Sequence, residues 1–282
     1  MPPSSIQFLV IALAQRAFGG DLFCIDSIAI PQVFLLGSQK CSTSSLASQL
    51  YKEAHATYGK QKESHFFDEG WGERTDIHNF ARNFGKAGSC GPHAVAFDGT
   101  PNYVLDYVNP TRRRFLSYIR DAYGQERLRR TTFVMVLCDP VQRAQSYEYH
   151  PGLGCGGCFR EYVRSPDDFF QHQALKNGRY ADQVRDVLEF FGQITIIPAA
   201  IYWHHADLVV SELLGVIARR SGKLPTGRTF SKHPPRSNSH HHPKLEDDCP
   251  PATRGPALAA YFRDSTQYIY DKVEMPPACS AR

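Results

Sequence analysis

The stretch VFLLGSQKCSTSSLASQL, Val33 to Leu50, decides the fold that the sequence predicts. A short apolar run reaches Gly37, a polar turn follows, and Leu46, Leu50 and Ala54 then recur at helical spacing. A continuous apolar run that ends in glycine is typical of a buried parallel strand. The strand, turn and helix together point backbone N–H groups and a helix N-terminus into the turn, which favours a bound phosphate there.

The same turn carries one lysine and four hydroxyl side chains. Lys40 supplies a positive charge, and the hydroxyls that supply further donors are those of Ser42, Thr43, Ser44 and Ser45. If these residues only capped the helix, as serine and threonine commonly do, one hydroxyl would be enough. The nucleoside-triphosphatase pattern GxxxxGK[ST] does not fit, because the lysine is third after the glycine and the second glycine is missing. We therefore expect a phosphate-binding turn of another type.

Strands and helices alternate along the rest of the chain. Apolar or β-branched runs predict strands at 32–37, 94–101, 131–140 and 193–199. Apolar residues at helical spacing predict helices at 44–54, 110–124, 179–192, 205–222 and 254–273, and a long loop is expected at 224–253. This order indicates an α/β fold, a single P-loop-like domain with a central parallel sheet flanked by helices. We assign residues 29–275 to that domain and residues 1–28 to an N-terminal segment.

Composition and charge are those of an ordinary globular protein. The 282 residues include 42% hydrophobic and 21% charged side chains, and the net charge of +4 favours an anionic partner weakly and does not indicate nucleic acid. The sequence contains no apolar run of about eighteen residues, so a full membrane span is not expected. The apolar segment Phe8–Ala14 is similar to a weak signal-peptide core, although no basic residue precedes it, and a buried or amphipathic helix is the alternative. Membrane association is therefore expected through the N-terminus only.

Cysteine and histidine spacing does not indicate a metal site. Eight cysteines are few for a disulfide scaffold in a chain of this length, so they leave the compartment open. Cys155 and Cys158 form a lone CxxC, whereas a zinc site needs a second ligand pair. A local disulfide or two unpaired thiols is expected there. The run His240–His242 lies among prolines and predicts a polar loop, and no metal is expected.

Polar residues also follow the later predicted strands. Glu63 and His65 alternate in an extended segment beside aromatic residues, and the sequence DGTPNY at 98–103 ends the second strand. Arg143 and Ser146 are three residues apart, on one face of the helix that follows the strand at 131–140. In an open parallel sheet, ligands bind at the carboxyl ends of the strands. The sequence therefore predicts one site to which all these turns contribute.

In this order the segments resemble the sulfotransferases that use 3′-phosphoadenylyl sulfate (PAPS), and among them the heparan-sulfate type. Lys40–Leu46 is similar to the family pattern K-x-G-T-x-x-L, and Glu63–Asp68 matches E-x-H-F-F-D. Gly99–Tyr103 is similar in part to K-[ST]-P-x-Y, and Gly178–Ala181 meets G-x-Y-A. Cys138–Tyr149 is similar to R-[DN]-P-x-x-R-A-x-S-x-Y, with the tyrosine one residue later. The likeness spans residues 32 to 273.

The resemblance implies transfer of a sulfuryl group from PAPS, as co-substrate, to a hydroxyl or amine of a glycan or small-molecule acceptor. It makes Glu63 the general base, Lys40 the charge that neutralises the bridging oxygen, and His65 the residue that orients acceptor or base. A surface glutamate and a structural histidine are the alternatives. The 5′-phosphosulfate would lie against Lys40, Cys41, Ser42, Thr43, Ser44 and Ser45. The 3′-phosphate would lie against Cys138, Arg143, Ser146, Asn238, Ser239 and His240. For Arg143 and Ser146 the alternative is that they lie on a helix face exposed to solvent. Arg112–Arg114 would hold an anionic acceptor or face water.

The sequence also departs from the family pattern. Ser42 replaces the loop glycine, Gly99 replaces a lysine, and Cys138 replaces the first arginine of the 3′-phosphate motif. The late K-G-R-x-H-P loop aligns with Asn238–Pro243. Three cationic contacts would be lost or replaced by histidine, and each is typically worth about 1.5–3 kcal/mol. A catalytically impaired homologue that binds nucleotide or glycan is therefore an alternative function, and a small-molecule kinase is another. The resemblance to family members that act on glycans implies that this protein is located in the Golgi lumen or secretory pathway. A cytoplasmic location is the alternative.

Overall fold

The computed structural model describes most of the predicted α/β domain. The described residues are 21–68, 75–85, 90–105, 111–148, 173–223, 230–235 and 256–272. Several predicted features lie outside them: residues 1–20, the cysteines of the CxxC, and the late loop with Asn238, Ser239 and His240.

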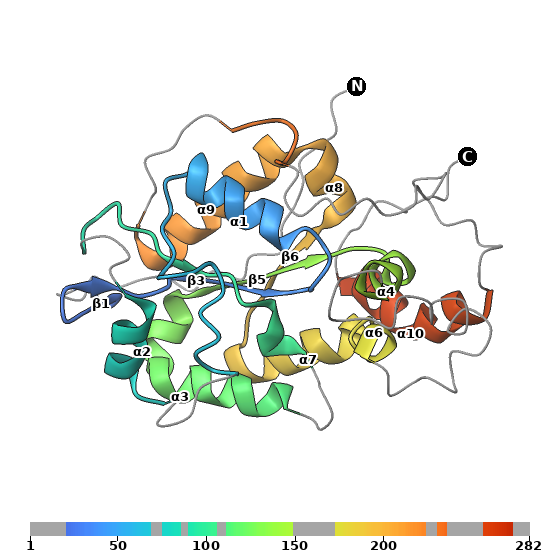
Figure 1. The fold of residues 1–282 in the computed structure, drawn as a ribbon, viewed down its shortest axis with the longest axis horizontal. Coiled ribbons are helices and arrows are strands. Elements are labelled where there is room, and N and C mark those ends of the chain that lie inside the picture. The colour runs from blue at the N-terminus through green and yellow to red at the C-terminus, as the bar shows by residue number, and fades with distance from the viewer. Residues whose placement is uncertain are drawn as a thin grey trace.

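A four-stranded parallel sheet forms the centre of the fold (Figure 1). Its order is β4-β3-β5-β6, and the strands are β3 (Val33–Gly37), β4 (Phe97–Asp98), β5 (Thr132–Leu137) and β6 (Thr195–Pro198). β3 and β5 are neighbours in the middle, with Leu35 opposite Val134. The predicted α/β fold with a central parallel sheet is confirmed. Because β3 and β5 are parallel neighbours, the turns that follow them meet at the same edge of the sheet.

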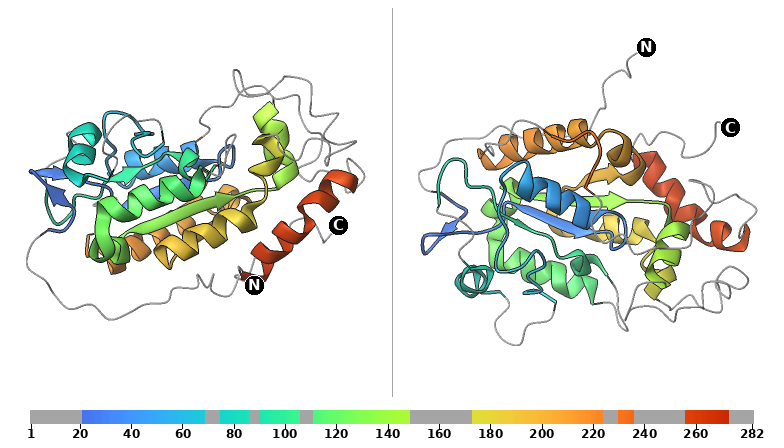
Figure 2. Two further views of the ribbon diagram at one scale, coloured as in Figure 1. Left: turned by 90° about the horizontal axis from the view of Figure 1, so that it is seen from below. Right: turned by 45° about the horizontal axis from the view of Figure 1, so that its top comes forward.

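Helices cover both faces of this sheet (Figure 1, Figure 2). One face packs against α1 (Thr43–Lys52), α8 (Ala199–His204) and α9 (Ala206–Ser221). The other packs against α2 (Ile77–Phe84), α3 (Arg112–Arg130) and α7 (Tyr180–Phe191). Strand alternation explains the two cores, because Val33 and Leu35 point to the first face while Phe34 and Leu36 point to the second.

Three helices pack together beyond the carboxyl end of β5. They are α4 (Pro140–Glu148), α6 (Gln173–Lys176) and α10 (Pro256–Lys272), and Figure 1 shows them at one end of the molecule. Their shared apolar cluster contains Ala144, Tyr147, Leu175 and Phe262. The helix that carries Arg143 is therefore held against other helices, and it is not a solvated surface helix.

Some elements differ from those expected from the sequence. The helix expected to stop at Gly124 continues to Arg130, because Gly124 adopts φ 65 and ψ 164 and kinks α3 without ending it. The second strand is reduced to Phe97–Asp98, since Pro101 begins a short 3-10 helix, η1 (Pro101–Val104). The sequence did not predict the hairpin of β1 (Cys24–Ile25) and β2 (Ile28–Ala29), nor α2 and α8.

A disulfide ties the hairpin to the segment before β4. Cys24 and Cys90 are bonded with a Cα–Cα distance of 5.7 Å. Phe23 and Ile25 of the hairpin are buried in the core on the α2 side of the sheet. Among the helices of the described residues, none combines the length and apolar character needed to cross a membrane.

The basic start of α3 is paired with α7. Arg112 Nε lies 2.6 Å from Asp186 Oδ2, and Arg113 Nη1 lies 2.5 Å from Asp186 Oδ1. Arg113 also pairs with Glu189, which raises the pKa of Arg113 further above its ordinary value. These two arginines hold α3 and α7 together, so neither of the two roles expected of them, acceptor binding or facing water, is needed to explain them.

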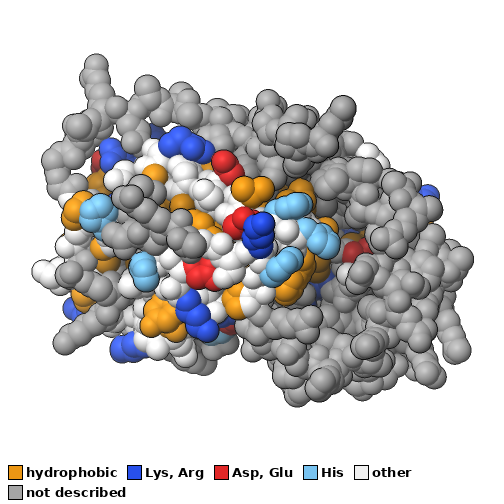
Figure 3. All heavy atoms as spheres, turned by 90° about the horizontal axis from the view of Figure 1, so that it is seen from above, with side chains coloured by type: hydrophobic (Ala, Val, Ile, Leu, Met, Phe, Trp, Pro, Cys, Tyr) orange, Lys and Arg blue, Asp and Glu red, His pale blue; other side chains and the backbone are white. Residues whose placement is uncertain are grey.

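The face over α1, α8 and α9 carries mixed side chains (Figure 3). Basic and acidic groups are interspersed with histidine and apolar groups among the coloured residues. The exposed large apolar side chains of these three helices are Tyr51, Trp203 and Leu208. This view of the described residues therefore shows no continuous basic surface.

Candidate active site

The turn after β3 contains two non-glycine residues with positive φ. Lys40 and Ser42 both have φ near 72°. Ser42 is the N-cap of α1, but its side chain makes no capping hydrogen bond. Thr43 and Ser45 are buried in the first helical turn, while Ser44 is half-buried and its Oγ lies 3.1 Å from Lys62 Nζ. Simple helix capping by Ser42 therefore does not explain this turn.

The left-handed Ser42 gives a testable prediction about stability. Replacing it with glycine, Ser42→Gly, should raise the free energy of unfolding by about 0.5–1 kcal/mol, because glycine adopts positive φ without the steric cost of a Cβ. Urea unfolding followed by circular dichroism measures the change. In the control Ser48→Gly, at a helical position of α1, stability should instead fall by about 0.5 kcal/mol. Equal destabilisation by both changes would contradict the left-handed assignment.

Lys40 lies close to a second, fully buried cation. Burial lowers the pKa of Lys40, and the nearby charge of Arg143 lowers it further. The Arg143 side chain is 0% exposed, and Nη1 donates to the Ala174 carbonyl at 2.9 Å. Its Nε and Nη2 have no hydrogen-bond partner. Buried polar groups are normally paired, so two unpaired donors beside a second cation fit a bound anion.

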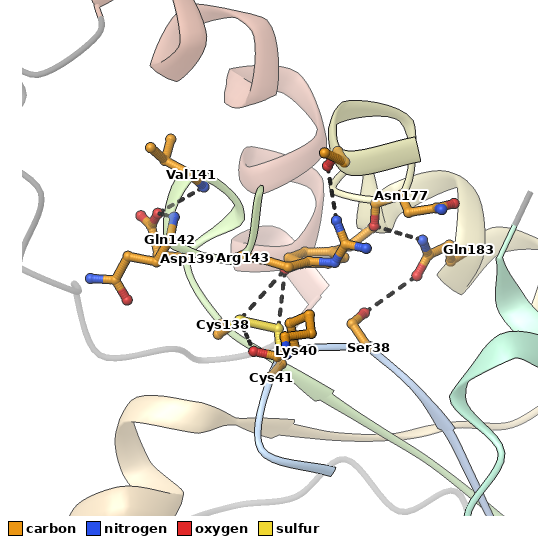
Figure 4. The surroundings of a disulfide bond; sticks show 12 residues. Ser38, Lys40, Cys41, Cys138, Asp139, Val141, Gln142, Arg143, Asn177 and Gln183 are labelled. Atoms are coloured by element: carbon orange, nitrogen blue, oxygen red, sulfur yellow. Dashed lines mark hydrogen bonds between the residues drawn. A yellow bond between two sulfur atoms is a disulfide. The ribbon is translucent and has the colours of Figure 1, made fainter. Parts of the chain in front are cut away.

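A disulfide joins the turn after β3 to the end of β5 (Figure 4). Cys41 and Cys138 are bonded with a Cα–Cα distance of 5.3 Å. The Tyr180 hydroxyl lies 3.4 Å from Cys41 Sγ and 3.8 Å from Cys138 Sγ. Both cysteines had been expected to contact phosphate, and sequence reasoning missed their pairing. The available signal was that Cys41 follows the predicted strand at 32–37 and Cys138 lies near the end of the predicted strand at 131–140. As a half-cystine, Cys138 brings no charge in place of the arginine.

Glu63 and His65 lie together, as their alternation in the sequence predicted. Glu63 Oε2 is 3.4 Å from His65 Nε2, and His65 Nδ1 is 3.0 Å from Asp68 Oδ2. Burial by itself raises the pKa of Glu63, but hydrogen bonding by His65 and the charge of Lys62 outweigh it and lower the pKa. Glu63 is therefore held as an ionised carboxylate, and Asp68 orients the imidazole from its other side.

A buried carboxyl group fixes the segment that carries Glu63 and His65. Asp98, at the end of β4, accepts hydrogen bonds from the hydroxyls of Ser64 at 2.5 Å, Thr100 at 2.6 Å and Tyr103 at 2.9 Å. Burial raises the pKa of Asp98, and these hydrogen bonds act against that rise. Because Ser64 lies between Glu63 and His65, Asp98 ties both to the sheet. Sequence reasoning placed DGTPNY at this edge but gave Asp98 no role.

The residues predicted to bind the 3′-phosphate differ from one another in burial, and some lie outside the described residues. Arg143 and Ser146 share α4, but Arg143 is buried whereas Ser146 is half-buried. Asn238, Ser239 and His240 lie outside the described residues, so their roles stay predictions. Within the parts of the chain that the structure describes, no group of three His, Cys, Asp or Glu side chains is arranged to hold a metal ion.

Comparison with known proteins finds likenesses among solved structures. The chain is similar to the crystal structure of a sulfotransferase from Alicyclobacillus acidocaldarius, with a TM-score of 0.60 and 21% sequence identity. The match covers 88% of this chain and 98% of that one. This likeness shows the fold. No protein-family model matches the sequence, and the comparison with curated proteins gives no match. The fold thus agrees with the expectation from the sequence motifs.

Proposed function

We propose that the protein is a PAPS-dependent sulfotransferase that moves a sulfuryl group to a hydroxyl or amine of an acceptor, with a glycan as the favoured acceptor class. One observation carries the proposal: the buried Arg143, with two unpaired guanidinium nitrogens, lies near Lys40 at the turn after β3, and the ionised Glu63 faces the same turn. Glu63 reaches that turn through Lys62, which pairs with Glu63 and hydrogen-bonds Ser44. The likeness in fold to a sulfotransferase supports the same reaction class.

The phosphate groups of PAPS fit the positive charges at this edge of the sheet. Lys40, the hydroxyls of Ser42–Ser45 and the N–H groups at the start of α1 would hold the 5′-phosphosulfate. Arg143 and Ser146 would hold the 3′-phosphate, together with the late loop predicted from the sequence. Both unpaired nitrogens of Arg143 would then find an acceptor, which removes the cost of leaving them buried and unpaired.

Transfer requires a base on the acceptor side of the sulfur and a positive charge on the side of the leaving group. Glu63 would remove the proton of the acceptor hydroxyl or amine as the new bond to sulfur forms. Lys40 would neutralise the charge that develops on the bridging oxygen as its bond to sulfur breaks and adenosine 3′,5′-bisphosphate leaves. His65, held by Asp68, would keep the Glu63 carboxylate oriented. The protein then acts by positioning and by charge stabilisation, as in phosphoryl transfer.

The Cys41–Cys138 disulfide favours a second candidate function. Because Cys138 is bonded to Cys41, it carries no charge where the family pattern has arginine, and Gly99 carries none either. A catalytically impaired homologue that binds nucleotide or glycan would tolerate both losses. The kinase alternative would need a magnesium-binding set in addition.

Radiolabelled sulfate transfer from PAPS to a panel of glycans and phenols tests the proposal. We expect transfer to at least one glycan, and Lys40→Ala should weaken both transfer and binding of adenosine 3′,5′-bisphosphate. Binding of that nucleotide without transfer to any acceptor would support the impaired homologue. Magnesium-dependent turnover of ATP would support the kinase instead.

The proposed base also predicts the pH dependence of transfer. Glu63 must be ionised to accept a proton, so kcat/KM should fall only as the pH drops through the Glu63 pKa. Hydrogen bonding by His65 and the charge of Lys62, against the opposing effect of burial, place that pKa below the ordinary value of 4.5. Initial rates over the pH range in which the circular dichroism spectrum is unchanged measure the profile. An acidic midpoint well above the ordinary value would contradict this assignment.

We also propose that the protein works in an oxidising compartment, in agreement with the secretory location that the resemblance implied. Cys24–Cys90 and Cys41–Cys138 are both disulfide-bonded. Structural disulfides persist in secreted and lumenal proteins and are rare in the cytosol.

A further inference from the structure

We infer that Lys62 is a further catalytic residue, whose ammonium binds the sulfuryl group during transfer and supplies the charge that Gly99 lacks. The inference rests on the proposed function, and it concerns a residue that the sequence motifs left without a role. Its basis is the position of Lys62 between the donor turn and the base.

The first observation concerns the partners of the ammonium group. Lys62 Nζ hydrogen-bonds Ser44 Oγ at 3.1 Å and pairs with the Glu63 carboxylate. Ser44 belongs to the turn proposed to hold the phosphosulfate, and Glu63 is the proposed base. The Lys62 ammonium therefore lies between the turn proposed to hold the donor and the base proposed to deprotonate the acceptor.

The second observation concerns the space over Gly99. A Cβ built on Gly99 would lie 3.1 Å from Lys62 Cγ and 3.1 Å from the Lys62 carbonyl oxygen. The Gly99 N–H donates to that carbonyl at 2.9 Å, so the two backbones are fixed against each other. Because the Lys62 stem lies over Gly99, a side chain at position 99 would crowd the Lys62 side chain, which would have to shift by a few tenths of an ångström. The packing therefore favours a single lysine that reaches the site from one of these two backbones.

The third observation concerns what the ammonium can still bind. A lysine ammonium has three N–H donors, and the contacts of Lys62 use two of them, to Ser44 and Glu63. The Lys62 side chain is 25% exposed, so it is partly shielded from water and still open to a ligand. The third donor is available for an oxygen of the sulfuryl group. The same charge helps keep Glu63 ionised, since His65 and Lys62 are the groups that lower its pKa.

The test compares Lys62→Gln with Lys62→Arg and with Lys60→Gln as a matched control. Lys60 is an exposed lysine two residues away. We expect kcat for transfer from PAPS to fall about 10- to 100-fold in Lys62→Gln, the value of one charged hydrogen bond, and less in Lys62→Arg. Lys60→Gln should transfer as the unmodified protein does.

A binding measurement without acceptor separates this role from a structural one. Adenosine 3′,5′-bisphosphate lacks the sulfuryl group, so Lys62→Gln should bind it as the unmodified protein does, while its affinity for PAPS should fall. A second variant, Lys62→Ala with Gly99→Lys, places the lysine on the other backbone and should recover part of the transfer lost in Lys62→Ala alone.

The outcomes distinguish this inference from the proposed function. If the unmodified protein binds neither nucleotide, both are wrong. If it binds and transfers, and Lys62→Gln keeps full turnover and full PAPS affinity, only the role of Lys62 is wrong. Equal losses of affinity for both nucleotides, or a loss of folded protein in gel filtration, would show that Lys62 acts structurally and would also overturn the inference.

Discussion

Replacing Glu63 with glutamine should lower the rate of sulfuryl transfer by about 10²–10⁴-fold, the usual effect of removing a general base. Glutamine keeps the size and hydrogen bonding of the side chain but has no oxygen that can take the acceptor proton. Binding of adenosine 3′,5′-bisphosphate should stay nearly intact, because Glu63 is ionised and would repel an anion if it contacted one. Single-turnover transfer measures the rate, and calorimetry measures the binding.

A matched control makes this result specific. Glu126 is an exposed glutamate of α3, and Glu126→Gln changes the same charge away from the site. It should leave transfer and binding unchanged. Full turnover in Glu63→Gln would mean that another group takes the proton. Loss of both nucleotide binding and transfer would instead show that Glu63 holds the site together through Lys62 and His65.

Removing the disulfide in the candidate site should destabilise the fold and weaken donor binding together. In Cys41→Ser with Cys138→Ser, the free energy of unfolding should fall by about 3–5 kcal/mol, because the bond closes a loop with a sequence separation of 97. The turn after β3 would also lose its covalent link to the end of β5. Affinity for adenosine 3′,5′-bisphosphate should then fall about tenfold, since binding must order the released turn.

The other disulfide is the natural control for this experiment. Cys24–Cys90 has a sequence separation of 66, so loop entropy predicts a stability loss that differs by only about 0.3 kcal/mol. Cys24→Ser with Cys90→Ser should therefore unfold at a similar urea concentration but bind nucleotide normally at low temperature. Equal binding by the two double variants would refute the view that Cys41–Cys138 organises the donor site. The comparison separates a local effect on the turn from a global loss of stability.

The fold was predictable from the sequence where the signals are local. β3 and β5 appear as continuous apolar runs because both of their faces are buried, and α1, α7 and α9 appear through the spacing of their apolar residues. α3 was placed correctly but ended too early, since a glycine with φ 65 is compatible with a helix end and with a kink. Sequence spacing does not distinguish these two cases.

The sequence by itself determined which residues could form the site. Lys40 and its hydroxyls follow a buried strand, so turn chemistry indicated them, whereas the resemblance to the sulfotransferase motifs indicated Glu63 and His65. The tertiary structure alone decided that Cys41 bonds to Cys138, because the pairing depends on β3 and β5 being neighbours in the sheet.

Two further features also depend on packing between distant segments. Arg143 is buried with two unpaired nitrogens because α4 packs against α6 and α10. The spacing of residues on α4 does not predict which helices pack against it. Lys62 occupies the space over Gly99 because a backbone hydrogen bond joins the end of β4 to the segment before Glu63. Strand and helix periods are properties of neighbouring residues, whereas burial, cross-links and shared space are properties of segments brought together by the whole fold.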